Sequence, residues 1–203
     1  MIKNIIFDIG NVLMTFSPVT YYKEIFHDEA LTEKVCQAIF SHDAWLKYDQ
    51  GVLFMKDLYE IYHKEYPQYQ TEIDIILKDW MKLMQPMEIS FSLMQRLKKE
   101  GYHIYILSNI SKDSADYLKA NQPFFDWSDG CVLSYEEKIV KPDTRIYQIL
   151  LKRYNLKAEE CLFIDDNEKN IIAAKEMGIH GITLDQSDQI ETYVNTYLEK
   201  TTC

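Results

Sequence analysis

The sequence predicts an α/β fold: a doubly wound parallel sheet with an α-helical segment inserted after the first strand. Two features of the chain support this prediction. Short apolar runs recur and end at polar residues, which is typical of strands buried on both faces of a parallel sheet. Helical patterns lie between these runs, and strands that alternate with helices imply right-handed βαβ units.

Five short runs rich in β-branched and aromatic residues are predicted to be strands: residues 5–7, 104–107, 130–134, 161–164 and 181–184. Three of them end directly before a polar side chain, namely Asp8, Ser108 and the pair Asp165-Asp166. In open α/β sheets, ligands bind at the carboxyl ends of the strands. We therefore expect these side chains to gather at one edge of the sheet.

The predicted helices of the sheet region are residues 89–100, 142–154 and 170–177. The first stops at Gly101 and the third at Gly178, as helices commonly do at glycine. Pro142 suits the beginning of the second helix, because proline is favoured in the first helical turn.

Residues from about 17 to 87 differ from the rest, since they are rich in Tyr, Phe, Lys and Glu and show no strand–helix alternation. Amphipathic helices are predicted at residues 30–40, 54–66 and 73–84. We expect residues 17–87 to form a helical cap domain on an α/β core of residues 1–16 and 88–203. Pro18 and Pro86 lie where the hinges would be. Most of its aromatic residues should pack between helices, and one or two should face a substrate; the candidates are Tyr21, Trp45, Tyr48 and Phe54.

The composition limits the kinds of partner. With 22 Lys+Arg against 32 Asp+Glu, the net charge of −10 argues against a general nucleic-acid binder. The start of the chain lacks a secretory signal pattern, and no run is long and apolar enough to cross a bilayer. The four cysteines form no CxxC pair and the five histidines show no ligand spacing. We expect a cytoplasmic protein with reduced thiols, no zinc and no membrane partner, as a monomer or a homodimer.

The predicted edge of the sheet has an electrostatic problem, because Asp8, Asp165 and Asp166 would gather there. Two carboxylates ~4 Å apart repel by about 4 kcal/mol at an effective dielectric constant of ~20. A hard divalent cation with oxygen ligands relieves this repulsion, and Mg²⁺ typically binds few carboxylates together with phosphate and water. Lys141 adds a positive charge, and Ser108 adds a hydroxyl followed by backbone N–H groups that suit an anion. The pattern predicts a phosphate site with a carboxylate nucleophile.

Four segments in this order resemble the motifs of the haloacid dehalogenase-like hydrolases: FDIGNVL at residues 7–13, LSN at 107–109, KPD at 141–143 and FIDDNEKN at 163–170. The resemblance spans nearly the whole chain. It implies a Rossmann-like core with a helical cap, and a small phosphorylated metabolite as substrate. The arrangement around Asp165, Asp166 and Asn170 resembles the sugar-phosphate phosphatases, including glucose-1-phosphatase-like proteins.

The resemblance also implies roles for single residues. Asp8 would attack phosphorus and form an aspartyl-phosphate. Ser108, Asn109 and Lys141 would bind the phosphoryl group, Lys141 also steadying Asp8. Mg²⁺ would be held by Asp8, the Gly10 carbonyl, Asp166 and Asp165 or a water bound to it.

One position departs from the family pattern. Its phosphatases usually carry a second Asp, the general acid and base, two residues after the nucleophile, where this chain has Gly10. General acid–base catalysis is typically worth ~10²- to 10⁴-fold. Either the enzyme is slower, or a cap residue or a water chain replaces the Asp, or the reaction is a different one. Good leaving groups need the acid least, which favours a sugar 1-phosphate. A purely structural explanation of Gly10 is a loop that needs a positive φ or a close backbone approach.

Several alternatives stay open at this point. Lys138 competes with Lys141 for the phosphate, but it is the better candidate for a solvated loop charge. Arg145 is expected to form an ion pair. Asn11 is expected to form a turn, and Asn170 to orient its own loop. Among functions, the alternatives are a 2-haloacid dehalogenase-type hydrolase, which uses an aspartate nucleophile without a metal, a phosphomutase, and a catalytically silent module that binds a phosphorylated ligand.

Overall fold

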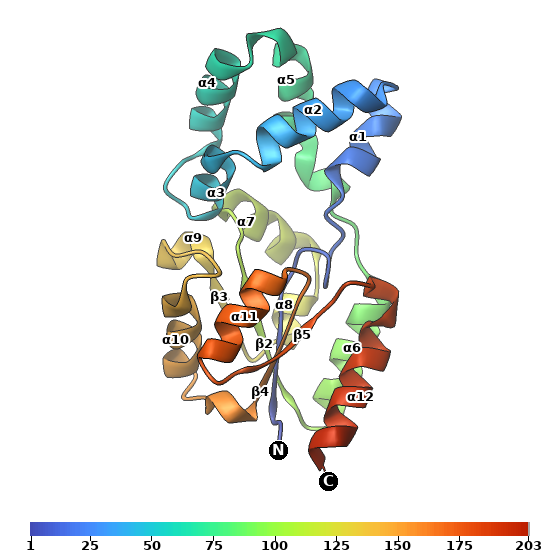
Figure 1. Cartoon of the computed structure of the whole chain (residues 1–203), viewed down its shortest axis with the longest axis vertical. Helices are drawn as coiled ribbons and strands as arrows, with labels where there is room; N and C mark the ends of the chain where they lie inside the picture. The colour runs from blue at the N-terminus through green and yellow to red at the C-terminus, as the bar shows by residue number, and fades with distance from the viewer. Residues whose placement is uncertain (203) are drawn as a thin grey trace.

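The computed structural model describes residues 1–202 and contains one five-stranded sheet. Its strands are β1 (Asn4–Phe7), β2 (His103–Ser108), β3 (Gly130–Leu133), β4 (Cys161–Asp165) and β5 (His180–Thr183). The strand order is β3-β2-β1-β4-β5 and every neighbouring pair is parallel (Figure 1). The predicted doubly wound α/β fold is confirmed, and β1, which carries the nucleophile candidate, lies at the centre of the sheet.

Both faces of the sheet are covered by helices, which explains why its strands are apolar throughout. Ile5 and Phe7 point to the face covered by α6 (Glu88–Lys99), α7 (Lys112–Asn121) and α12 (Ile190–Thr202). Ile6 points to the opposite face, which is covered by α10 (Thr144–Arg153) and α11 (Glu168–Glu176). The remaining short helices of this part are α8 (Phe124–Trp127), α9 (Ser134–Glu137), η3 (Ala158–Glu160) and η4 (Ser187–Gln189).

Two helices of the sheet region begin two residues from their predicted positions, and in both cases a side-chain hydrogen bond at the N-terminus sets the boundary. α10 begins at Thr144 rather than at Pro142, because the Asp143 carboxylate accepts a hydrogen bond from Arg145 N–H at 3.0 Å. α11 begins two residues earlier than predicted, because the Asn167 side chain accepts from Lys169 N–H at 3.0 Å. The Asn167 N-cap places the first turn of α11 next to the polar residues at the end of β4.

A group of helices lies over the carboxyl edge of the sheet (Figure 1). It consists of α1 (Pro18–Phe26), α2 (Glu29–Phe40), α3 (Asp43–Asp49), α4 (Met55–Glu65), η1 (Pro67–Tyr69), α5 (Gln70–Asp79) and η2 (Trp80–Leu83). The helix predicted over residues 73–84 is thus α5 followed by the separate 3₁₀ turn η2. We call this group the cap; the domain boundaries at residues 17 and 87 stay a prediction.

Two chain segments join the cap to the sheet region, and they run side by side. Met87 N–H donates to the Leu13 carbonyl at 3.0 Å, and Thr15 N–H donates to the Gln85 carbonyl at 2.9 Å. The Thr15 hydroxyl also accepts from Gln85 N–H and donates to the Leu83 carbonyl, both at 2.9 Å. The two segments are therefore held together as one connection.

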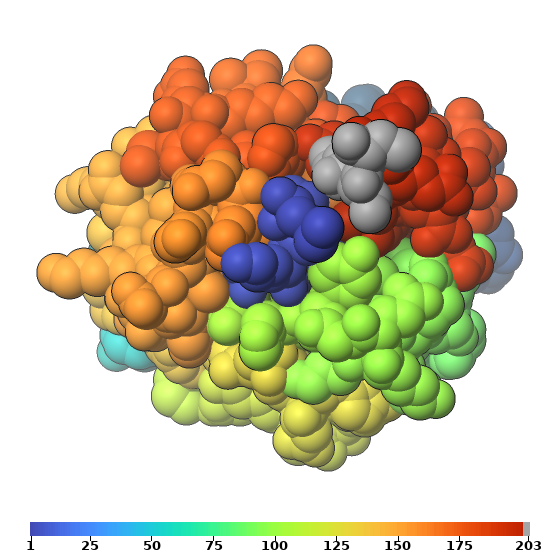
Figure 2. All heavy atoms as spheres, turned by 90° about the horizontal axis from the view of Figure 1, so that it is seen from below, coloured from blue at the N-terminus to red at the C-terminus, as the bar shows by residue number. Residues whose placement is uncertain are grey.

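The N-terminus lies at the end of the molecule opposite to the cap, where its first residues reach the surface (Figures 1 and 2). Among residues 1–202, no helix is both long and apolar enough to cross a membrane. Cys36, Cys131 and Cys161 are free thiols, and Cys203 lies outside the described residues.

Candidate active site

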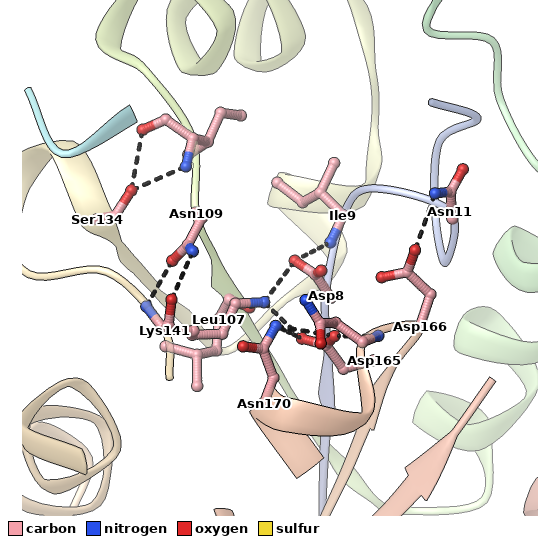
Figure 3. A network of polar contacts seen from close by, with 12 residues as sticks. Asp8, Ile9, Asn11, Leu107, Asn109, Ser134, Lys141, Asp165, Asp166 and Asn170 are labelled. Carbon is pink, nitrogen blue, oxygen red and sulfur yellow. Dashed lines mark hydrogen bonds and ion pairs between the residues drawn. The ribbon is translucent and has the colours of Figure 1, made fainter. Parts of the chain in front are cut away.

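Asp8 follows β1 directly and lies at the centre of a network of polar contacts (Figure 3). Its side chain is almost entirely buried. The carboxylate oxygen Oδ1 accepts a hydrogen bond from Ile9 N–H at 2.7 Å and lies 2.9 Å from Lys141 Nζ. Both contacts converge on one oxygen, so they fix the orientation of the carboxyl group while Oδ2 takes part in neither.

Lys141 is buried and its ammonium group has three protein partners. Besides Asp8 Oδ1, Nζ donates to Asp165 Oδ2 at 2.6 Å and to the Leu107 carbonyl at 3.0 Å. An ammonium group has three N–H donors, so these contacts use all of them. The structure thus places Lys141 as a clamp between two carboxylates; the predicted contact with a phosphoryl oxygen requires one of these bonds to be exchanged and stays a prediction.

Ser108 is the last residue of β2 and Asn109 follows it, and both line the same cavity as Asp8. Ser108 is buried against Asp8, and its hydroxyl favours the ionised form of that carboxyl, lowering its pKa. The Asn109 side chain is directed at Lys141: Oδ1 accepts from the Lys141 N–H at 2.7 Å and Nδ2 donates to the Lys141 carbonyl at 3.0 Å. The Asn109 amide therefore positions Lys141, which leaves the backbone N–H of Asn109 for its predicted phosphate role.

The two acids after β4 have different surroundings. Asp165 is fully buried, and Asn170 Nδ2 lies 3.0 Å from both of its oxygens, while Asn167 N–H donates to Oδ1 at 2.8 Å. Asp166 is partly exposed and accepts from Asn11 Nδ2 at 2.8 Å. Asp165 is thus saturated by protein donors, whereas Asp166 faces open space with one oxygen held.

The three acids form a site that suits a divalent cation. Among the residues that the structure describes, Asp8, Asp165 and Asp166 are the group whose ligand oxygens lie within 4.8 Å of one another. Gly10, whose carbonyl was predicted as a further ligand, lines the same cavity. The donors are all oxygens, which matches the preference of Mg²⁺. The residues present therefore fit this ion.

The same crowding changes the acidity of the carboxyl groups. Burial, opposed by the charge of Lys141 and reinforced by the charge of Asp165, raises the pKa of Asp8 to about 7. Burial also raises the pKa of Asp166, where the hydrogen bond from Asn11 opposes the shift. Three carboxylates against one ammonium leave excess negative charge, which a cation at this place would compensate.

A cavity of about 170 Å³ lies between these residues and the cap. Asp8, Gly10, Ser108, Asn109 and Asp166 line its floor; the cap and its linkers contribute Phe16, Trp45, Asp49, Trp80 and Met84. Of the aromatic candidates, Trp45 lines the cavity. Tyr48 instead donates to Asp113 at 2.8 Å, and Phe54 is 59% exposed. The periodicity of the cap gives no sign of which helix end points to the sheet, which is why Asp49 and Trp80 could not be found from the sequence.

Comparison with known proteins decides the family. A sequence model of the haloacid dehalogenase-like hydrolases matches residues 2–178, which include all of the sheet's strand-end acids. The chain belongs to this family. The resemblance inferred from the four motifs is thereby confirmed.

Relatives of this hydrolase include two proteins named as phosphatases. It is 28% identical over 187 residues, 91% of each chain, to the sesquiterpene phosphatase astK of Aspergillus oryzae. It is 26% identical over 199 residues, 88% of this chain and 89% of the relative, to the D-ribitol-5-phosphate phosphatase of Bacteroides thetaiotaomicron. A HAD family enzyme of B. thetaiotaomicron, solved with magnesium and inorganic phosphate, shares the fold with a TM-score of 0.68, 24% identity, and coverage of 90% and 94%.

Gly10 of the hydrolase does not fit the structural explanation considered above. Its φ is not positive, and a Cβ built at this position would meet nothing within 4 Å. The left-handed residue of the loop is Asn11, with a φ of 52°. Asn11 thus makes the turn, as expected, but it also binds Asp166, which the sequence did not indicate. The loop therefore has room for a Cβ atom at position 10.

The remaining basic candidates are also placed. Arg145 pairs with Asp143 at 2.6 Å on the surface, which confirms the expected ion pair. Lys138 lies outside the polar network, and its ammonium donates to the Gly51 carbonyl of the cap at 2.6 Å. It is exposed, as expected of a loop charge, but it also links the cap to the sheet region. Asn170 orients its loop as expected, through Asp165.

Proposed function

We propose that this hydrolase is a Mg²⁺-dependent phosphatase that cleaves a small phosphate monoester through an aspartyl-phosphate on Asp8. The observation that supports this most is the arrangement of Asp8. Its carboxyl group is fixed through one oxygen by Lys141 and Ile9 N–H, beside an acidic cluster and on the floor of a cavity. Holding a nucleophile in an attacking orientation supplies much of the rate of such reactions.

The residues around Asp8 have complementary roles in this proposal. Lys141 keeps Asp8 ionised and oriented, while the Ser108 hydroxyl and the Asn109 backbone N–H bind oxygens of the phosphoryl group. Asp8, the Gly10 carbonyl and Asp166 would hold Mg²⁺. Asp165, whose oxygens already accept from Lys141 and Asn170, positions Lys141 and does not need to bind the ion itself. When bound, Mg²⁺ supplies positive charge to the phosphoryl oxygens.

For the substrate we propose a sugar phosphate or a related polyol phosphate. The cavity of about 170 Å³ is smaller than the ~300–1,000 Å³ of pockets that hold drug-sized ligands. On the cap side, the cavity is lined by the aromatic residues Trp45 and Trp80 and by the polar Asp49. This combination suits a small molecule with both C–H faces and hydroxyls. The activity named for the D-ribitol-5-phosphate phosphatase is in agreement.

The site disfavours the alternative reactions considered from the sequence. A dehalogenase-type hydrolysis needs no metal, and it gives no reason for three acids whose oxygens lie within 4.8 Å of one another. A silent binding module would not need a carboxylate held in an attacking orientation by a buried lysine.

The test is phosphate release by the purified protein from a panel of sugar, polyol and prenyl phosphates, with Mg²⁺ or with EDTA. We expect turnover of a sugar or polyol phosphate that requires Mg²⁺ and is abolished in Asp8→Asn. Turnover that persists in Asp8→Asn, or in EDTA, would contradict the mechanism. Preference for the prenyl phosphate would refute only the substrate class. Ligand-dependent stabilisation without any turnover would favour the binding module.

A further inference from the structure

The cavity contains one acid that the proposed chemistry has not used. Asp49 is the last residue of α3 and lines the same cavity as Asp8, from the cap side. Asp8 lines the floor of this cavity, so the two acids border the same space from the sheet side and from the cap side. Gly10, on the floor below, leaves the place of the family's usual acid free of side-chain atoms.

The end of α3 is fixed to the sheet region by several hydrogen bonds on both sides of Asp49. The Ser134 hydroxyl donates to the Asp49 carbonyl at 2.6 Å. Gln50 Nε2 donates to the Lys138 carbonyl at 2.6 Å, and Lys138 Nζ donates back to the Gly51 carbonyl at 2.6 Å. Catalytic groups must be held within roughly 0.5 Å of their productive position. These hydrogen bonds hold Asp49, a residue of the cap, in a fixed position relative to the sheet.

The two carboxyl groups that face the cavity differ in their partners. Asp8 is bound by Lys141 and Ile9 N–H, which favour its ionised form. Asp49 has no ammonium partner among the described residues. Burial raises the pKa of Asp49 to about 7, the charge of Asp8 raises it too, and the Ser111 N–H opposes the shift. Asp8 is thus held in place by a cation, whereas Asp49 lacks such a partner and can donate or accept a proton near neutral pH, as a general acid and base must.

From this geometry we infer that Asp49 is the general acid and base of the reaction, supplied by the cap in place of the residue that is missing at Gly10. The inference rests on the proposed phosphatase function. In the first half-reaction, Asp8 Oδ2 forms a bond to phosphorus, the bond from phosphorus to the leaving oxygen breaks, and the Asp49 proton passes to that oxygen. In the second, ionised Asp49 takes a proton from the attacking water, inorganic phosphate leaves, and Asp8 is regenerated as a carboxylate.

This assignment changes the expected range of substrates. The preference for a sugar 1-phosphate rested on the absence of an acid, because only a good leaving group departs unprotonated. With Asp49 as the acid, esters of ordinary alcohols are substrates as well. The enzyme should therefore hydrolyse a simple alkyl phosphate at a rate comparable to that of an anomeric sugar phosphate.

The test compares Asp49→Asn with the wild type on two probes in the presence of Mg²⁺, an alkyl phosphate and p-nitrophenyl phosphate, whose leaving group needs no proton. We expect kcat/KM for the alkyl phosphate to fall ~10²- to 10⁴-fold, the range typical of general acid–base catalysis. The burst of p-nitrophenolate should fall less than ~10-fold, and phosphorylated protein should accumulate because the second step lacks its base. Asp43→Asn, the same change at the exposed first residue of α3, is the control and should behave as wild type.

A second variant guards against a merely structural effect. Because a Cβ at Gly10 meets nothing within 4 Å, Gly10→Asp can be introduced into the Asp49→Asn protein, where it should restore at least ~10-fold of the lost alkyl phosphatase activity. Equal losses on both probes, or full activity of Asp49→Asn, would overturn the role of Asp49 and leave the proposed function intact. A wild type that releases no phosphate from any ester would overturn both.

Discussion

The side-chain amide of Asn109 binds the backbone of Lys141 on both sides of its Cα: Oδ1 accepts from the Lys141 N–H at 2.7 Å, and Nδ2 donates to the Lys141 carbonyl at 3.0 Å. Residues 32 positions apart in the chain are thereby locked together at the edge of the sheet. The buried ammonium group of Lys141 reaches Asp8 and Asp165 only because its backbone is held in this place. Asn109 thus acts on the nucleophile through a second residue.

Asn109→Ala should impair catalysis more than stability. It removes two hydrogen bonds, each worth about 1 kcal/mol net, and lets Lys141 shift relative to Asp8. A displacement of ~1 Å in an active site can cost about 10²-fold in rate. We expect kcat to fall ~10- to 100-fold while unfolding free energy, measured by urea denaturation, falls by about 1–3 kcal/mol. The control Asn121→Ala, which removes one exposed hydrogen bond to the Tyr117 carbonyl, should leave kcat unchanged.

Asp165 and Asp166 should respond differently to the same substitution. Asp165→Asn removes a buried partner of Lys141, and breaking buried ion pairs costs up to about 3–5 kcal/mol. Asp166→Asn removes a charge that the protein does not pair, so the melting temperature in EDTA should stay the same or rise. The stabilisation by added Mg²⁺ should be lost in Asp166→Asn. Normal stabilisation of that variant by Mg²⁺ would refute Asp166 as a ligand.

Asn11 should tune the affinity for Mg²⁺ through its hydrogen bond to Asp166. Asn11→Gly removes the side chain but keeps the left-handed backbone, whose φ of 52° glycine adopts without strain. Removing a partner of a metal ligand typically weakens metal binding ~10- to 100-fold. A titration of the melting temperature with Mg²⁺ measures this. An unchanged midpoint would show that Asn11 serves the turn alone.

Without Mg²⁺ the stability of the protein should fall as pH rises, and added Mg²⁺ should counteract that fall. The pKa of Asp8 is about 7 in the folded protein, whereas an unfolded Asp has about 3.9. The folded state therefore binds more protons than the unfolded state between these values, and stability falls as pH rises through that window. Asp166, whose pKa is also raised, acts in the same direction.

The measurement is a series of thermal melts from pH 5 to pH 8 in EDTA and in Mg²⁺. We expect the rise in melting temperature caused by Mg²⁺ to be larger at pH 8 than at pH 5, because protons compete with the ion for these carboxylates. In Asp8→Asn the pH dependence in EDTA should be weaker. An equal effect of Mg²⁺ at both pH values would contradict this coupling.

The sequence was sufficient for the sheet and for the residues at its edge. Buried parallel strands leave a strong pattern, and the topology brings their ends together, so Asp8, Ser108 and the acids after β4 could be placed without coordinates. The secondary contacts could not be predicted in the same way. Nothing in the sequence around Asn109 indicates that its amide spans to Lys141 rather than capping a helix, since both uses suit the residue type.

The cap was predicted as helical, but its contribution to the cavity was not. Asp49 and Lys47 lie on the same short helix, which packs against α4 and α9, yet Asp49 lines the cavity and Lys47 is exposed. Gly10 is the opposite case. Its sequence context suggested a loop that needs a positive φ, but the backbone at Gly10 does not have one.

The paired segments at Leu13–Met87 and Thr15–Gln85 have a consequence for how the molecule works in time. They tether the cap along one seam, while its far side is held by the hydrogen bonds that Tyr48, Asp49, Gln50 and Gly51 make with Asp113, Ser134 and Lys138. A rotation of the cap about that seam would open the cavity to the next substrate ester. The same motion would move Asp49 away from Asp8. Substrate could then enter only while the enzyme is unable to react. Water that enters the open form would have no general base near it.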